Sequence, residues 1–165
     1  MRQYQGLEFS ELKEEDIEEL IQIMTRAFDE DSRLHLNQPK GGPPGYDTGE
    51  FLRRYGLDPG SEAYKVSYED RLIGGVIVWI NRETNINFLG CLFIDVNVQN
   101  KGMGKRIWEF IEKEYPATKI WRTETPAFSR RNHNFYVNKC GFHVVHIDNP
   151  KDPMESSYQF EKIMR

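Results

Sequence analysis

The chain has 165 residues, of which 38% are apolar and 13% aromatic. This length is enough to bury a substantial core and corresponds to one domain, so we expect a single domain over residues 1–165. The 22 Lys and Arg residues do not outnumber the 26 Asp and Glu residues, and the formal net charge is −4. Because polyanions are bound through an excess of cations, this balance argues against a general nucleic-acid or anionic-membrane binder, and leaves open only a local basic patch.

The two cysteines, Cys91 and Cys140, stand alone rather than in a CxxC or Cys/His cluster. This spacing indicates neither a disulfide framework nor a metal site, so we expect small core residues in a reducing compartment. The first twenty residues lack the pattern of a signal peptide, and no apolar stretch approaches the roughly 20 residues of a membrane span. We therefore predict a cytoplasmic protein with no metal and no membrane segment.

A weak strand pattern over residues 4–9 precedes the first strong helical pattern. Ser10 is a suitable N-cap, and the apolar residues after it recur at helical spacing, which predicts an amphipathic helix over residues 12–28. The apolar positions of this helix are Ile17, Leu20, Ile21, Met24, Ala27 and Phe28.

Residues 29–60 are polar and rich in Gly and Pro, with KGGPPGY at 40–46 as the clearest interruption. We predict a long ordered connection, and a flexible linker is the alternative. Asp47 and Glu50 are suited to capping a short helix that carries Phe51, Leu52 and Tyr55.

The remainder of the chain alternates between strand and helix patterns. Strands are predicted where branched and aromatic residues cluster between turn signals, and helices where apolar residues recur at helical spacing. The predicted strands are 63–68, 71–80, 86–98, 118–123, 142–147 and one near 157–163, and the predicted helices are 105–115 and 129–139. This order predicts a mixed sheet with helices packed on it.

The most informative stretch, IDVNVQNKGMGKRIWEFIE at 94–112, joins a strand to a helix through a glycine-rich loop. Glycines let the backbone turn tightly and approach a ligand, and the free N–H groups at a helix start favour an anion, so the loop suits a phosphate or pyrophosphate. A P-loop would need other residues at Gln99 and Arg106, and a dinucleotide fingerprint would need Gly at Ile107. A plain strand-to-helix turn with solvated cations is the structural alternative.

Gln99, Gly102 and Gly104 match the Gln-x-x-Gly-x-Gly pyrophosphate motif of the GCN5-related N-acetyltransferase (GNAT) superfamily, which residues 94–141 resemble. A second segment with Asn132, Tyr136 and the Gly141-Phe142 pair resembles the family's other cofactor-side motif. The resemblance implies an α/β (α+β) GNAT fold, with a mixed, mostly antiparallel central sheet of six to seven strands flanked by about four helices.

The same resemblance implies an acyltransferase that moves an acetyl group from acetyl-CoA to an amine of a small molecule or peptide, by direct attack on the thioester. Backbone groups of Ile94 and Val96 would pair with the pantetheine arm like an added strand, with the amide near Ile94 as the oxyanion donor. The expected cofactor-binding residues are Ile94, Val96, Gln99, Asn100, Lys101, Gly102, Met103, Gly104, Lys105, Asn132 and Tyr136.

Tyr136 is the expected acid that protonates the leaving thiolate, as implied by the family. Its spacing to Gly141 is five residues where the family usually has four, and one residue rotates a helical side chain by about 100°. Tyr136 as a packed core aromatic is therefore the alternative. For the general base we rank Glu124 first and Asp95 second, with Glu83 and His133 as further candidates.

The region after the first helix contains an acidic and partly aromatic set that would attract a cationic amine, and a solvated acidic loop is the alternative. The set consists of Asp29, Glu30, Asp31, His35, Tyr46, Asp47 and Glu50. A monomer and a homodimer are both compatible with the sequence. Two other functions stay open: an acyl-CoA-binding module without transfer activity, and an interaction domain in which the glycine loop is only a turn.

Overall fold

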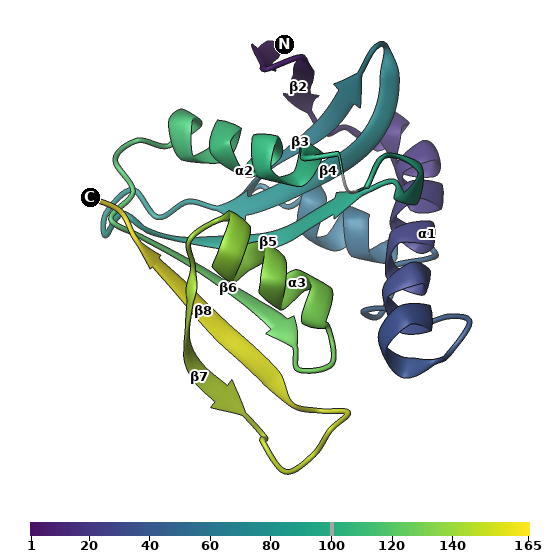
Figure 1. Ribbon diagram of the computed structural model, residues 1–165. Coiled ribbons are helices and arrows are strands. Elements are labelled where there is room, and N and C mark those ends of the chain that lie inside the picture. Colours follow the sequence, from purple (N-terminus) through teal and green to yellow (C-terminus); the bar gives the residue numbers. More distant parts are fainter. Residues whose placement is uncertain (100) are drawn as a thin grey trace.

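The computed structural model describes residues 1–99 and 101–165. Within those residues, eight strands form one sheet in the order β1-β2-β3-β4-β5-β6-β8-β7 (Figure 1). Neighbouring strands are antiparallel except for β5 and β6, which are parallel. The strands are β1 (Arg2–Tyr4), β2 (Leu7–Glu11), β3 (Ser61–Tyr68), β4 (Arg71–Trp79), β5 (Ile86–Ile94), β6 (Ile120–Pro126), β7 (His143–Asp148) and β8 (Ser157–Ile163).

This sheet confirms the predicted mixed, mostly antiparallel architecture, with slightly more strands than expected because the N-terminal segment forms a hairpin of two. The helices are α1 (Ile17–Leu36), α2 (Met103–Glu114) and α3 (Arg130–Asn134). Short 3₁₀ turns occupy η1 (Glu14–Asp16) and η3 (Val96–Val98), and single π-helical turns occupy η2 (Leu52–Gly56) and η4 (Phe135–Lys139). Among the described residues, no helix is both long and apolar enough to cross a membrane.

Two apolar clusters cover the two faces of the sheet. On one face, Ile107 and Trp108 of α2 pack with Trp121 of β6 and with Tyr136 of η4. On the other face, α1 and η2 pack on the central strands β4 and β5, with Leu20 fully buried. The helices that carry the predicted cofactor motifs therefore share one face, while α1 lies on the other.

Helix α1 begins and ends later than predicted. Ser10 lies in β2, so it is not the N-cap, and the first helical turn follows η1, where the side chain of Asp16 accepts a hydrogen bond from Lys13 N–H at 2.9 Å. The helix continues to Leu36, eight residues beyond the predicted end. The apolar pattern stops at residue 28 because the buried positions in the last turns are Asp31 and Ser32, so periodicity alone could not detect them.

The Gly- and Pro-rich segment after α1 is packed against that helix. Asp29 accepts hydrogen bonds from Gly41 N–H at 3.1 Å and from the Tyr46 hydroxyl at 2.6 Å. The Ser32 hydroxyl donates to the Gly41 carbonyl at 2.9 Å. A Cβ added at Gly42 would lie 2.8 Å from the Tyr46 ring. These contacts confirm an ordered connection and contradict a flexible linker.

Strand β5 contains a bulge and then separates from β6. Ile77 pairs with Cys91 and Val78 with Leu89, so Gly90 is the extra residue. A bulge bends its strand and increases the local twist. Pairing with β6 is confined to Ile86, Asn87 and Phe88. Beyond these residues the two parallel strands diverge, which opens the sheet at its centre (Figure 1).

Strand β5 ends earlier than the sequence suggested. Ile94 is its last residue, and Asp95 accepts a hydrogen bond from Asn97 N–H at 3.2 Å, which turns the chain into η3. The prediction of a strand to residue 98 is therefore wrong over its last four residues, and Val96 lies in a 3₁₀ turn.

Candidate functional site

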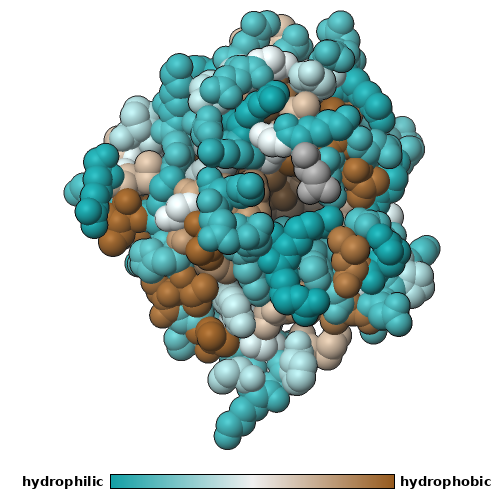
Figure 2. All heavy atoms as spheres, viewed as in Figure 1, coloured by the Kyte–Doolittle hydropathy of each residue, from teal (hydrophilic) through white to brown (hydrophobic). Residues whose placement is uncertain are grey.

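A cleft of about 450 Å³ lies where β5 and β6 diverge. Its walls come from the end of α1, the end of β5, the loop leading into α2, and the α3–η4 segment. Figure 2 shows this face of the molecule hollowed near its centre, with mostly hydrophilic residues around the rim. Many of the predicted cofactor residues line it, namely Ile94, Gln99, Gly102, Met103, Gly104, Lys105, Asn132 and Tyr136.

The start of α2 has the geometry of an anion site. Gly102 has φ +75° and ψ 8°, a left-handed conformation that favours glycine, and a Cβ there would meet no atom within 4 Å. The first turn of α2 holds no acidic residue. Within the described residues, Lys101, Lys105 and Arg106 form no ion pair, although cations at a helix start oppose its dipole. An anion at this position would remove that conflict. Asn100, predicted to belong to this loop, lies outside the described residues.

Gly104 is required for a different reason. A Cβ at this position would lie 3.0 Å from Cε1 of Phe135 and 3.2 Å from Cδ1 of Ile94. The absence of a side chain lets the first turn of α2 approach η4 and the end of β5. Met103 lines the cleft, but it is only 4% exposed and packs into the core cluster.

The peptide of Ile94 faces the cleft. Asp95 N–H donates to the carbonyl of Ile73 on β4 at 2.7 Å. Because successive residues of a strand direct their N–H and C=O groups to opposite sides, the N–H and C=O of Ile94 point toward the side where β6 has diverged. Val96 is not a continuation of this edge, since it lies in η3. Of the two predicted backbone partners, Ile94 is the one that the strand geometry exposes.

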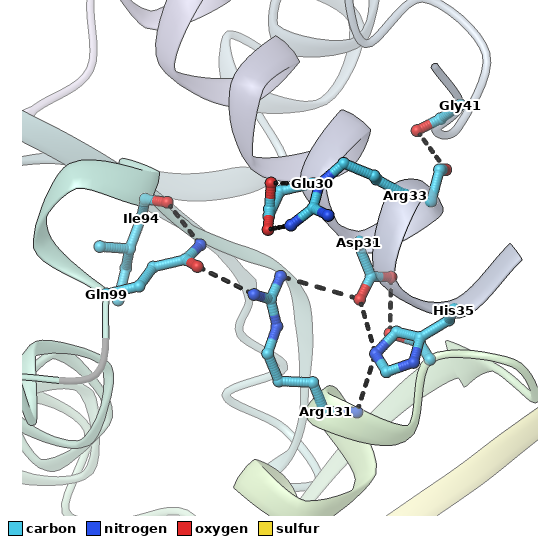
Figure 3. A network of polar contacts seen from close by, with 10 residues as sticks. Glu30, Asp31, Arg33, His35, Gly41, Ile94, Gln99 and Arg131 are labelled. Carbon is cyan, nitrogen blue, oxygen red and sulfur yellow. Dashed lines mark hydrogen bonds and ion pairs between the residues drawn. The ribbon is translucent and has the colours of Figure 1, made fainter. Parts of the chain in front are cut away.

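Gln99 belongs to a polar network that crosses the cleft (Figure 3). Its Nε2 donates to the Ile94 carbonyl at 3.1 Å, and its Oε1 accepts from Arg131 Nη1 at 2.9 Å. Arg131 Nη2 lies 3.8 Å from Oδ1 of Asp31, whose Oδ2 accepts from the Ser129 hydroxyl at 2.8 Å. Both ends of the Gln99 amide are therefore engaged by protein groups, and the Ile94 carbonyl keeps a second lone pair for another donor.

Tyr136 is 7% exposed and lines the cleft. Burial raises the pKa of its hydroxyl far above the ordinary value, and nearby Cys91 and Cys140 add to the shift, while a hydrogen bond with Thr123 lowers it. The extra residue in its spacing to Gly141 is accommodated in the π-helical turn η4, which is wider than an α-helical turn. The side chain therefore still turns toward the core and the cleft.

Glu124 lies on the other face of β6. Thr123 is buried on the side of Tyr136, and side chains alternate along a strand, so Glu124 points to the opposite side. Its Oε1 accepts a hydrogen bond from the Ser157 hydroxyl at 2.7 Å. Glu83, the hairpin candidate, is exposed in the turn between β4 and β5.

Asp95 is the buried partner of an ion pair. It is 2% exposed, and its Oδ2 lies 2.8 Å from Arg26 Nη2. Burial alone would raise the pKa of this carboxyl, but hydrogen bonds from Arg26 and Asn97, with the charges of Arg26 and Arg71, outweigh burial and lower it. A carboxylate with a lowered pKa is a poorer base, and this one already pairs with Arg26 and lies 3.9 Å from Arg71. Asp95 is therefore not suited to be the general base.

His133 is held by structural contacts. Its Nε2 lies 3.0 Å from the Pro126 carbonyl, and its ring stacks on Tyr158 with centroids 4.4 Å apart. Burial lowers the pKa of its imidazole. These contacts tie α3 to the sheet. None of Glu124, Glu83 and His133 is among the residues that line the cleft.

The acidic set after α1 is largely used within the protein. Asp29 holds Gly41 and Tyr46, and Glu30 pairs with Arg33. Of the set, only Asp31 lines the cleft among the described residues. The charged residues that line the cleft are Asp31, Lys105, Arg131 and Lys139. Because most of this acidic set does not line the cleft, it gives little support to the prediction that these residues attract a purely cationic amine.

Sequence reasoning missed Arg131, Lys139 and Phe135 as cleft residues. They lie within three residues of the recognised Asn132 or Tyr136, and a short irregular helix offers no periodicity that separates a cleft-facing cation from a solvated one. The single available signal was the pair of arginines at the start of the segment, Arg130 and Arg131, one of which is exposed.

Comparison with known proteins decides the family. A model described as "Acetyltransferase (GNAT) family" matches residues 17–142, which include α1, the glycine loop and the Tyr136 segment. The chain belongs to the GNAT acetyltransferase family. The resemblance noted in the sequence is thereby confirmed, and so is the GNAT fold.

A curated relative and two solved structures illustrate the likeness. The uncharacterized protein YrkN of Bacillus subtilis is 43% identical over 91 residues, which is 55% of this chain and 49% of YrkN. The chain thus matches about half the length of this relative. An acetyltransferase from Thermus thermophilus superposes with TM-score 0.76 at 14% identity, covering 96% of this chain and 97% of the other. The PaiA N-acetyltransferase of Thermoplasma acidophilum, solved with coenzyme A, superposes with TM-score 0.75 at 19% identity, covering 96% and 99%.

Proposed function

We propose that this GNAT protein is an N-acetyltransferase in which residues 1–165 form one domain that transfers an acetyl group from acetyl-CoA to a primary amine of a small molecule or peptide. The observation that carries the proposal is the cleft between the diverging strands β5 and β6. It has an exposed strand edge at Ile94, an anion-suited helix start at Gly102–Lys105, and a buried tyrosine at Tyr136.

The residues present fit coenzyme A. The N–H groups and cations at the start of α2 would hold the pyrophosphate, where Gly102 leaves open space for it. The Ile94 peptide would pair with the amides of the pantetheine arm as an added strand would. Gln99 supports that edge by fixing the turn between Ile94 and the loop. Asn132 lines the same wall from α3.

When bound, acetyl-CoA supplies the thioester whose carbonyl carbon bonds to the acceptor nitrogen while the C–S bond breaks. The Ile94 N–H, on the side where β6 has diverged, would donate to the oxyanion that forms. Tyr136 keeps its proton at neutral pH because its pKa is raised, and an un-ionised hydroxyl can give a proton to a departing thiolate.

The remaining requirement is a group that takes a proton from the ammonium. Glu124 is our candidate, because it follows the point at which β6 leaves β5 and lies on the face opposite Tyr136. An amine that approaches from that face would meet a carboxylate, either directly or through a water molecule. The two proposed proton-transfer groups would then lie on opposite faces of the divergent strands.

The direct test is release of CoA thiol from acetyl-CoA in the presence of a panel of amines, together with calorimetric titration of CoA. We expect micromolar CoA binding and release that depends on the amine. CoA binding without release for any amine would replace the enzyme by an acyl-CoA-binding module. The absence of CoA binding would contradict the whole assignment and favour the interaction domain.

Variants assign the roles. Tyr136→Phe should lower kcat by about 10²-fold with near-normal CoA affinity. Tyr115→Phe is the matched control, because Tyr115 also has a pKa raised by burial but bonds to Tyr64 and Glu62 outside the cleft. Glu124→Gln should shift the pH at which the rate reaches its plateau, whereas Glu83→Gln should not. Equal effects of each variant and its control would remove that residue from the mechanism.

A further inference from the structure

Two oppositely charged side chains in the cleft are incompletely paired with each other. Asp31, in the last turns of α1, and Arg131, at the start of α3, approach to 3.8 Å between Oδ1 and Nη2. This distance is within the range of an ion pair but beyond that of a hydrogen bond. Both residues line the same cleft, and Figure 3 shows them directed toward each other from its two walls.

Asp31 is fixed but unsatisfied. The residue is 7% exposed, and its Oδ2 is anchored by the Ser129 hydroxyl, which is itself fully buried. Its Oδ1 has no hydrogen-bond partner among the described residues, and the neighbouring His35 Nε2 lies 3.5 Å away. A buried carboxylate oxygen without a donor is costly, so a native structure normally supplies one from protein, water or ligand.

Arg131 is likewise held and only partly used. Of its five guanidinium N–H donors, one bonds to Gln99 Oε1 at 2.9 Å, and the described residues provide no second hydrogen bond. Its side chain is 31% exposed, at the mouth of the network. The planar guanidinium therefore retains donors with the spacing that a carboxylate accepts in pairs.

We infer that Asp31 and Arg131 together bind the ammonium and carboxylate groups of a zwitterionic acceptor, which makes a free α-amino acid the substrate class of the proposed acetyl transfer. The two charges of an α-amino acid are attached to one carbon, which matches two complementary protein charges only a few ångströms apart. The inference rests on the proposed function for its reaction, but the binding that it requires is independent of turnover.

The local charge balance favours a zwitterion over either simple ion. A simple cation would be attracted by Asp31 but repelled by Arg131. A simple anion would be attracted by Arg131 but repelled by Asp31. A zwitterion satisfies both without leaving a net charge at the site. Ala27 and Phe28, one turn before Asp31 on α1, provide an apolar wall in the same cleft for a side chain.

The test compares each of the common α-amino acids with its carboxamide, which keeps the amine but lacks the carboxylate, and includes spermidine as a purely cationic amine. We expect the best amino acid to exceed its carboxamide in kcat/KM by about 10- to 100-fold. Arg131→Gln should remove this preference through a higher KM for the acid. Asp31→Asn should raise KM for the acid and the carboxamide alike. Arg130→Gln, at the exposed neighbour, is the matched control and should change neither.

Calorimetric titration of the same amino acid into the CoA-saturated protein measures the site without turnover. Binding by wild type and its loss in Arg131→Gln, both measured at saturating CoA, supports the inference. It is overturned if the amino acid does not bind, if carboxamides or spermidine are acetylated as well as amino acids, or if Arg131→Gln binds the amino acid as tightly as wild type does. If the protein acetylates only other amines, the proposed acetyltransferase function stands and the amino-acid site is refuted. If it binds amino acids but does not acetylate them, the site stands and the proposed reaction is refuted. Circular dichroism and a thermal melt confirm that each variant is folded.

Discussion

The close approach of Phe135 to Gly104 predicts how much a side chain at residue 104 would destabilise the protein. In Gly104→Ala, the new Cβ would lie 3.0 and 3.1 Å from two ring atoms of Phe135 and 3.2 Å from Ile94 Cδ1, so η4 must shift away from α2. Overpacking of this kind costs about 1–3 kcal/mol. Replacing glycine by alanine inside a helix returns about 0.5–1 kcal/mol. We therefore expect a net loss of about 1 kcal/mol, or about 2–4 °C in Tm for a chain of this size.

Urea unfolding monitored by circular dichroism measures this loss, and a double-mutant cycle identifies its cause. Phe135→Leu removes the ring, so Gly104→Ala introduced into that background should cost less than it does in wild type. CoA affinity should fall with Gly104→Ala, because the wall displaced by the methyl group lines the cleft. If Gly104→Ala costs the same in both backgrounds, contact with Phe135 does not explain the glycine and our account of this loop is wrong.

Three further predictions concern groups outside the reaction. Asp95 has a lowered pKa, so its contribution to stability is present above the unfolded pKa of about 4 and is lost as the pH falls through the folded pKa. Asp95→Asn should therefore lower the free energy of unfolding by about 1–2 kcal/mol at pH 7 and flatten the acid side of its pH profile, measured by urea unfolding. An unaltered profile would refute this role of Asp95. Burial raises the pKa of both Cys91 and Cys140 to about 12, so a thiol reagent at pH 8 should label neither in the native protein and both after unfolding; rapid native labelling contradicts this. Tyr46→Phe removes the hydroxyl that bonds to Asp29, so it should lower the free energy of unfolding by about 1 kcal/mol and speed amide hydrogen exchange over residues 37–51. Unchanged exchange would mean that other contacts order the segment.

Much of the fold was predictable because its elements follow simple periodic rules. The strands near residues 63–68, 71–80 and 157–163 were located almost to the residue, since alternating or continuous apolar runs end at clear turn signals. Helix α1 was cut short because its last two turns bury polar side chains. The pattern failed there for a physical reason: residues that line a cleft are not chosen for apolar packing.

The sequence by itself determined the glycine-rich strand-to-helix loop, the family, and the presence of Tyr136 on the segment that faces it. These features depend on backbone conformation and spacing within a few residues, which local sequence encodes. Tertiary structure decided what those residues touch. The bulge at Gly90 and the divergence of β5 from β6 turn the Ile94 peptide toward an open cleft, and the π-helical turn keeps Tyr136 buried despite its unusual spacing.

The tertiary structure differs most from the sequence-based expectation in the use of its acidic residues. A net charge of −4 and an acidic segment after the first helix suggested a cationic acceptor. In the folded chain, Asp29 holds a loop, Asp95 pairs with Arg26, and Asp31 meets Arg131 from a helix one hundred residues later in the sequence. Composition counts charges, but whether a carboxylate remains free for a ligand depends on which cation the fold places beside it, and only the tertiary structure brings those partners together.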